Sequence, residues 1–225
     1  MPKPKAGSIF SISEVIRQLG KAAAEWETPW VEEDAKRHPS RPFRVLVACL
    51  LSLRTQDRTT AAASSRLFSL AETPEALSSL AVETIEKTIY PVGFYRNKAR
   101  ILKNIAEDLV VNYGSRVPDT LDNLLKLKGV GRKTANLVIS VGYNKPGICV
   151  DTHVHRITNR WGYICTRTPD ETETVLRKKL PKRYWKQINS LLVMFGQNCC
   201  KPVSPLCSGC RINKYCARAG VTRSR

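Results

Sequence analysis

The chain has 225 residues, which is enough for one or two domains with a hydrophobic core. Its 37 Lys and Arg outnumber 19 Asp and Glu, which gives a formal net charge of +18. This excess is typical of a protein that binds an anionic polymer, so we expect nucleic acid as the partner, with a solvated cationic surface as the alternative. The longest apolar stretch, residues 45–53, is too short to span a bilayer, and the N-terminus MPKPKAGS has no apolar segment behind it. We therefore expect neither export nor a membrane anchor.

Apolar residues recur at helical spacing along the chain, without the sustained alternation that is typical of strands. Three helix starts can be recognised, in chain order: Asp57 ahead of residues 61–70, Thr73 with Pro74, and Asp119 after Pro118. Residues 98–113 place apolar side chains on one face, and Gly114 stands where that helix would end. The sequence therefore predicts an all-α fold of roughly ten short helices, with disorder expected only in residues 1–8 and after Arg218.

The stretch LKGVGRKTAN, residues 127–136, predicts a helical hairpin, in which one helix ends at Leu127 and a second begins at Arg132. Gly129 and Gly131 allow positive φ angles and the close approach of another backbone, while the amides at the second helix start are suited to donate to phosphate. A hairpin of this composition can grip a DNA backbone. Considered alone, the glycine motif is equally consistent with an ordinary turn between helices.

The chain contains eight cysteines, and without a secretory signal clustered cysteines indicate a metal site more often than disulfides. Gaps of six, two and five residues separate Cys200, Cys207, Cys210 and Cys216. Four thiolates in one compact loop can hold tetrahedral zinc or an iron–sulfur cluster, and the spacing leaves both open. We expect the remaining cysteines to be core thiols, namely Cys49, Cys149, Cys165 and Cys199.

After the hairpin comes GICVDTHVHRITNR, in which Asp151 precedes a helical run. LKGVGRKTAN followed by VDTHVHR resembles the helix-hairpin-helix DNA glycosylases of the endonuclease III family. The resemblance extends over most of the chain, through LLSLRTQD at residues 50–57, VGFYRNKA at 92–99 and the C-terminal cysteines. It implies two helical lobes: a central lobe that ends in the hairpin, and a discontinuous lobe that carries a cluster loop. We place these lobes at residues 35–145, and at 1–34 with 146–225.

The resemblance also implies a cofactor, because family members of this type carry a 4Fe-4S cluster on cysteines with these gaps. We therefore assign the cluster to Cys200, Cys207, Cys210 and Cys216. In the family the loop between the first two cysteines tends to be basic and touches DNA. Here it reads KPVSPL, with Lys201 as its only cation, so its contribution to DNA binding is open.

The chemistry implied by the resemblance is removal of a damaged base by an amine, followed by strand scission through β-elimination. Lys133 matches the family's nucleophile and Asp151 its catalytic aspartate. A lysine with its ordinary pKa of ~10.4 is protonated at neutral pH and cannot attack. A helix start lowers this pKa only slightly. We therefore expect burial to lower the pKa of Lys133 most, with a smaller contribution from the like charge of Arg132. Alternatively, Lys133 and Arg132 bind phosphate, and Asp151 only caps its helix.

To reach its bond such an enzyme extrudes the nucleotide, and inserted side chains replace part of the lost stacking. Phe94 lies where relatives have an apolar wedge, although a single aromatic is also consistent with the core. Many relatives have glutamine where this chain has Arg54, and Gln56 lies two residues on, so either can fill the vacated base position. The expected DNA-binding residues are Arg54, Gln56, Phe94, Gly129, Val130, Gly131 and Arg132.

We therefore predict a bifunctional glycosylase and abasic-site lyase that acts, by resemblance, on oxidised pyrimidines in duplex DNA. The expected partner is double-stranded DNA with damaged bases or abasic sites. The protein is expected to be a monomer, cytoplasmic in a prokaryote, where it would associate with the nucleoid, and nuclear in a eukaryote. Two alternatives remain open: a mismatch-specific thymine or uracil glycosylase of the same superfamily, and a non-catalytic DNA-binding module. Retention of both Lys133 and Asp151 argues against the binding module.

Overall fold

A computed structural model describes residues 10–38 and 42–225, and all regular structure in these ranges is helical, with no strand. The prediction of an all-α fold is confirmed. The chain packs as two compact units. The hairpin unit spans Trp30–Gly147, and the cysteine unit combines the described residues up to Pro29 with Ile148–Arg225. The segment 1–8, for which we predicted disorder, lies outside the described residues.

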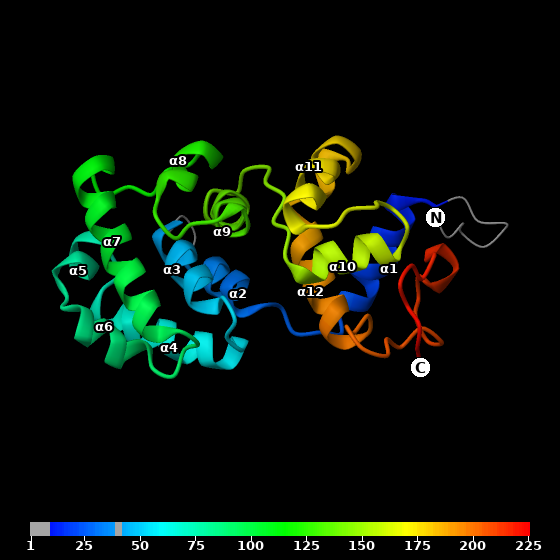
Figure 1. The fold of residues 1–225 in the computed structure, drawn as a ribbon, viewed down its shortest axis with the longest axis horizontal. Coiled ribbons are helices and arrows are strands. Elements are labelled where there is room, and N and C mark those ends of the chain that lie inside the picture. The colour runs from blue at the N-terminus through cyan, green and yellow to red at the C-terminus, as the bar shows by residue number, and fades with distance from the viewer. Residues whose placement is uncertain (1–9, 39–41) are drawn as a thin grey trace. The chain divides into compact units, whose positions relative to one another are not determined.

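The hairpin unit is built around α3, whose residues 43–51 are all buried. A helix that is buried on every side is stable only when neighbours cover all of its faces. Here α2, α4, α7 and α9 all contact α3, and α5 and α6 pack on the long helix α7 (Figure 1). The helices are α2 (Trp30–Arg37), α3 (Pro42–Ser52), α4 (Asp57–Leu70), α5 (Pro74–Ser79), α6 (Val82–Ile89), α7 (Tyr95–Tyr113), α8 (Leu121–Lys126) and α9 (Arg132–Leu137), which continues into a π-helical turn over Val138–Gly142.

Helix boundaries in this unit test the predicted caps. Thr73 caps α5 as predicted, and Gly114 ends α7 in the left-handed region at φ 55°. Asp57 is the first residue of α4 and not its cap. The cap of α8 is Thr120, whose hydroxyl accepts from the Asn123 amide at 3.4 Å, whereas the carboxylate of Asp119 pairs with Lys145. Both aspartates were wrongly assigned: α8 is capped by the neighbouring Thr120, and α4 begins at Asp57 itself, after Gln56, which makes no side-chain cap bond.

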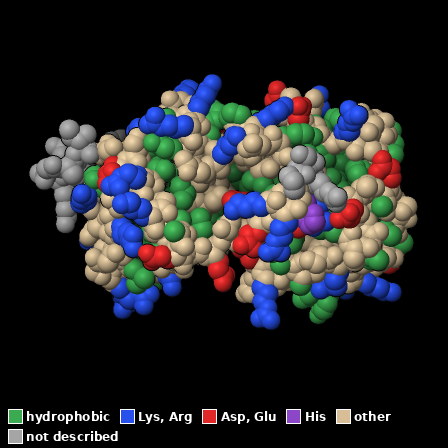
Figure 2. All heavy atoms as spheres, turned by 180° about the vertical axis from the view of Figure 1, so that it is seen from behind, with side chains coloured by type: hydrophobic (Ala, Val, Ile, Leu, Met, Phe, Trp, Pro, Cys, Tyr) green, Lys and Arg blue, Asp and Glu red, His purple; other side chains and the backbone are tan. Residues whose placement is uncertain are grey.

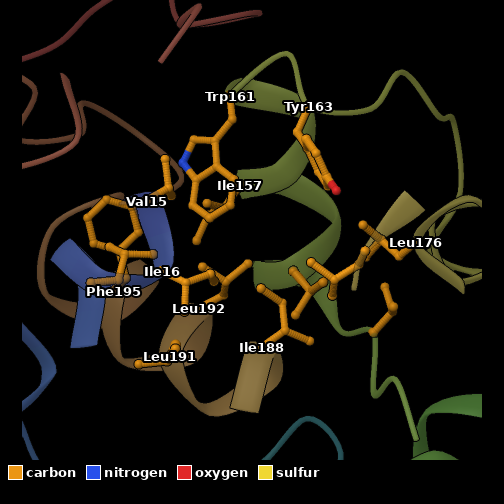
Figure 3. Close-up of a cluster of buried hydrophobic side chains, with 14 of the residues drawn as sticks. Val15, Ile16, Ile157, Trp161, Tyr163, Leu176, Ile188, Leu191, Leu192 and Phe195 are labelled. Atoms are coloured by element: carbon orange, nitrogen blue, oxygen red, sulfur yellow. The ribbon is translucent and has the colours of Figure 1, made fainter. Parts of the chain in front are cut away.

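The cysteine unit consists of helices α1 (Ile12–Ala23), α10 (Thr152–Arg160), α11 (Pro169–Lys179) and α12 (Trp185–Asn198), with short 3₁₀ turns at Lys182–Tyr184 and Asn213–Tyr215. Its core joins the N-terminal helix to the C-terminal half of the chain. Val15 and Ile16 of α1 meet Ile157 of α10 and Leu192 of α12 around the buried ring of Trp161 (Figure 3). Residues from both ends of the sequence are therefore needed to complete this core.

The segment after Arg218 is ordered, which contradicts our prediction. The Ser208 amide donates to the Arg225 carbonyl at 3.0 Å, and the Arg225 amide donates to the Pro205 carbonyl at 2.9 Å. The Ala219 amide also donates to the Arg160 carbonyl, at 3.0 Å. These contacts join backbone groups, which the polar side chains of this segment do not reveal.

Lys and Arg side chains are spread over much of the face drawn in Figure 2, with Asp and Glu in smaller groups. This distribution agrees with the formal net charge of +18. Among the described residues, none of the helices is both long and apolar enough to cross a membrane.

Candidate active site and cysteine pocket

The helical hairpin forms as predicted between α8 and α9, but its two glycines have different roles. Gly129 has a φ of 95°, and a Cβ there would approach Ile101 Cγ2 to 2.7 Å, so only glycine fits without movement. Gly131 has an ordinary extended conformation, with a φ of −94°, and a Cβ there would meet no atom within 4 Å. Between them, Val130 is buried and its amide donates to the Leu127 carbonyl at 3.0 Å. The turn is therefore held by one obligatory glycine and one buried side chain.

Lys133 lies in the first turn of α9, half-buried, beside the half-buried Arg132. The next residues are fully packed, and the Thr134 hydroxyl accepts from the Cys49 thiol at 3.6 Å. The Asn136 amide group donates to the Arg132 carbonyl at 3.0 Å. This buried face anchors α9 against α3, which fixes the backbone that carries Lys133.

Asp151 caps α10 in the cysteine unit. Its Oδ1 accepts from the amides of His153 and Val154, both at 2.9 Å. The preceding segment is held by buried Ile148 and by a 3.2 Å hydrogen bond from the Asn189 side chain to the Cys149 carbonyl. The capping role considered for Asp151 is therefore real, and both amide bonds use one carboxylate oxygen.

The structure brings together Arg54 and Phe94, which are 40 positions apart in the sequence. The guanidinium carbon lies 5.6 Å from the centroid of the Phe94 ring, within range of a cation–π contact. Both residues have left-handed backbones, with φ of 53° and 59°. Phe94 is 64% exposed, so it is no part of the core. Gln56 is exposed and precedes α4, without a side-chain cap bond.

One further side chain in this region was not singled out from the sequence. Lys98 lies in the motif VGFYRNKA and is only 6% exposed. Its ammonium donates to groups at the end of α3 and in the following loop. The sequence did contain a signal for Lys98, because this lysine falls on the buried face of its helix, where lysine is rare.

The four cysteines with gaps of six, two and five residues line one pocket. Its walls include Trp161, Phe195, Leu206 and Ile212, and the last ordered segment contributes Val221. Burial raises the pKa of the Cys200 thiol, and it raises that of Cys216 to about 11. No three Cys, His, Asp or Glu side chains of the described ranges lie close enough together to hold a single ion. Thiols spread around an apolar wall fit a larger sulfur-ligated group by their donor chemistry.

The remaining cysteines differ from one another. Cys49 and Cys149 are buried, as predicted for core thiols, whereas Cys165 is exposed. Cys199 lines the pocket together with the four spaced cysteines, and its thiol donates to the Leu206 carbonyl at 3.6 Å. Its position beside Cys200 in the sequence did not reveal this, because it falls outside the spacing pattern.

Helix α10 holds the loop that follows Cys200. Arg156 donates to the Cys200 carbonyl at 2.9 Å. Arg160 donates to the carbonyls of Lys201 and Pro202 at 2.7 and 2.6 Å. The helix that Asp151 caps therefore ends against the cysteine pocket.

Comparison with known proteins identifies the family. Residues 47–182 match the HhH-GPD superfamily of base excision DNA repair proteins. Endonuclease III of Thermotoga maritima is 49% identical over 189 residues, which are 82% of this chain and 89% of the relative. The chain belongs to the endonuclease III family. As the sequence resemblance implied, it is therefore a DNA glycosylase and abasic-site lyase of base excision repair.

Solved structures support the endonuclease III fold. A non-covalent endonuclease III–DNA complex is 33% identical with a TM-score of 0.81, covering 91% of this chain and 93% of that chain. A trapped endonuclease III–DNA covalent intermediate is 34% identical with a TM-score of 0.77, covering 92% and 96%. Both structures contain DNA, so this endonuclease III fold is one that binds DNA.

Proposed function

We propose that this chain excises oxidised pyrimidines from duplex DNA and then cleaves the strand at the abasic site, with Lys133 as the nucleophile. The observation that carries the proposal is the position of Lys133: it stands in the first turn of α9, directly after a hairpin turn whose Gly129 allows no side chain. The family relationship supports glycosylase and lyase chemistry.

Lys133 acts through its amine. The nitrogen attacks the anomeric carbon of the sugar, the bond to the base breaks, and the base leaves with the bonding electrons and a proton. Opening of the sugar ring yields a Schiff base. This cation withdraws electrons, so the neighbouring sugar carbon loses a proton and the 3′ phosphate departs. The amine links both steps.

Asp151 stabilises the positive charge that develops on the sugar. Its cap uses Oδ1 for both amides, so the carboxylate is held in one orientation while Oδ2 takes no part in the cap. A preorganised carboxylate of this kind lowers the barrier without reorganising during the reaction. Its second role is to move protons between the amine, the sugar and the departing base.

Phe94 enters the duplex as a wedge, and Arg54, in preference to Gln56, fills the vacated base position. The exposure of Phe94 and the contact of the Arg54 guanidinium with its ring favour this pairing. Gln56 instead adjoins the start of α4. The hairpin residues Gly129, Val130, Gly131 and Arg132 hold the DNA backbone.

The four spaced cysteines hold a 4Fe-4S cluster, which would cross-link the loop that surrounds the pocket. Purified protein should be yellow-brown and contain about four iron atoms per chain. Colourless protein with a single zinc ion would contradict this assignment. We expect a monomer that is cytoplasmic and associated with the nucleoid in a prokaryote, or nuclear in a eukaryote.

Substrate choice is tested by comparing duplexes that carry thymine glycol, uracil opposite guanine, thymine opposite guanine, or an abasic site. We expect the highest rate of base removal on thymine glycol and strand scission on the abasic duplex. Faster removal of mismatched thymine or uracil would favour the mismatch glycosylase. Tight binding of every duplex without turnover would leave only a DNA-binding module.

A further inference from the structure

Lys98 connects α7 to the end of α3. Its ammonium donates to the Leu51 carbonyl at 2.8 Å, to the Leu53 carbonyl at 2.6 Å and to the Thr55 hydroxyl at 3.2 Å. The last carbonyls of a helix have no partner within the helix, so a cation there satisfies them and complements the helix dipole. Burial lowers the pKa of Lys98 to about 8, which still leaves the group mostly protonated at pH 7.

Thr55 extends this network to the loop that carries Phe94. Its hydroxyl accepts from the Gly93 amide at 3.2 Å and also donates to the Leu53 carbonyl at 3.2 Å. Gly93 itself lies against the neighbouring loop, because a Cβ there would approach the Arg54 carbonyl oxygen to 2.6 Å. The two backbones therefore meet directly, with no room for a side chain between them.

Arg54 takes part in this contact through its carbonyl, and Phe94 directly follows Gly93. Both residues have left-handed backbones. Such conformations cost free energy for residues other than glycine and persist where surrounding contacts impose them. The hydrogen bonds of Lys98 and Thr55 lie directly beside these two residues, at the Leu53 carbonyl and at the Gly93 amide. Since Lys98 is buried and anchored on α7, it serves as the fixed point of the network.

We propose that Lys98 and Thr55 are positioning residues that fix the distance between Arg54 and Phe94, so that both side chains are preset before they enter DNA. The inference rests on the proposed roles of Phe94 and Arg54. Preset side chains lower the cost of extruding a base from a stacked duplex, but they add nothing when the base is already unpaired.

The test compares Thr55→Val, which keeps the shape of the side chain and removes the hydroxyl, with Thr55→Ser, which restores the hydroxyl. Single-turnover base removal is measured on a thymine glycol duplex and on the same lesion in single-stranded DNA. We expect Thr55→Val to slow the duplex reaction about tenfold and the single-stranded reaction less than twofold, with Thr55→Ser close to wild type. Thermal melting checks that each variant is folded.

Gly93→Ala provides a second route, since its Cβ would push the two loops apart. It should show the same selective loss on duplex DNA. Equal slowing of both substrates by Thr55→Val and Gly93→Ala, or no slowing by either, would overturn the inference. Phe94→Ala in the same assay distinguishes failure of the positioning role from failure of the wedge role. If Phe94→Ala slows only the duplex reaction and Thr55→Val does not, only the positioning role fails. If Phe94→Ala is not selective, the wedge fails and the inference fails with it.

Discussion

The first backbone amides of α9 and of α10 have no carbonyl partner within their helix. The residues beside these amides are of opposite charge in the two helices. At α10, the Asp151 carboxylate accepts from two backbone amides, which is the arrangement that a helix N-terminus favours. At α9, Gly131 supplies no side-chain cap, and the first two residues are the cations Arg132 and Lys133. Cations at this position are disfavoured by about 0.3–1 kcal/mol each.

Other helices of this chain follow the α10 pattern. Ser or Thr side chains cap α1, α5, α8 and α11, and an acidic residue lies in the first turn of each. Helices α4 and α6 also lack a side-chain cap, yet they too have an acidic residue in the first turn. The absence of acid together with two cations distinguishes α9 from these helices, but α7 has the same arrangement, with Arg96 and Lys98 in its first turn. The charge pattern at the start of α9 is therefore compatible with a stable helix, and variants of Lys133 are needed to test its chemical role.

Lys133→Gln should have the largest effect. It removes the amine, so borohydride trapping on damaged duplex should disappear and base removal should fall by about a thousandfold or more. DNA affinity should change little, since one phosphate contact among several is lost. Arg132→Gln is the matched control and should still be trapped. Efficient trapping of Lys133→Gln would show that another amine does the chemistry.

Asp151 variants separate the cap from the chemistry at the start of α10. Asp151→Asn and Asp151→Ala should both slow base removal by about a hundredfold, because neither has a charged carboxylate. Only Asp151→Ala should also lose about 1 kcal/mol of unfolding free energy, or about 2–4 °C in melting temperature, since asparagine can still cap. Normal activity in Asp151→Asn would show that the carboxylate serves as a cap alone.

Cys200→Ser should affect α10 and leave α9 unchanged. The variant should lose most of its iron, and amide hydrogen exchange in α10 should speed up about tenfold, because Arg156 and Arg160 hold the loop that follows Cys200. Cys199→Ser is the control and should keep its iron, although its thiol lines the same pocket. Iron loss in Cys199→Ser with retention in Cys200→Ser would reverse the ligand assignment.

Arg132→Ala should have the smallest effect. If Arg132 binds phosphate, the slope of log affinity against log salt should become shallower by about 0.9, with affinity falling by about threefold to tenfold at moderate salt. Arg177→Ala provides a comparison, because that guanidinium already pairs with Glu173 at 2.7 Å. An unchanged slope in Arg132→Ala would place its charge away from the DNA.

Local patterns in the sequence determined much of this protein. Helical periodicity predicted the all-α fold, because a helix repeats its buried face every three to four residues whatever it packs against. The hairpin and the cysteine loop were also predictable from the sequence, because the residues that define each of them lie close together in the chain. The same local reasoning misplaced caps at Asp57 and Asp119, where an adjacent residue precedes or caps the helix instead.

Only the tertiary structure decided which distant residues meet. The bond from Gly93 to Thr55 joins residues 38 positions apart, and that from Lys98 to Leu51 joins residues 47 apart. Neither depends on a periodic pattern, because each uses single backbone groups whose partners are chosen by how α3 packs on α7. The same holds for Arg225 against the cysteine loop. Sequence determined which helices form, and packing between them decided which loops come into contact.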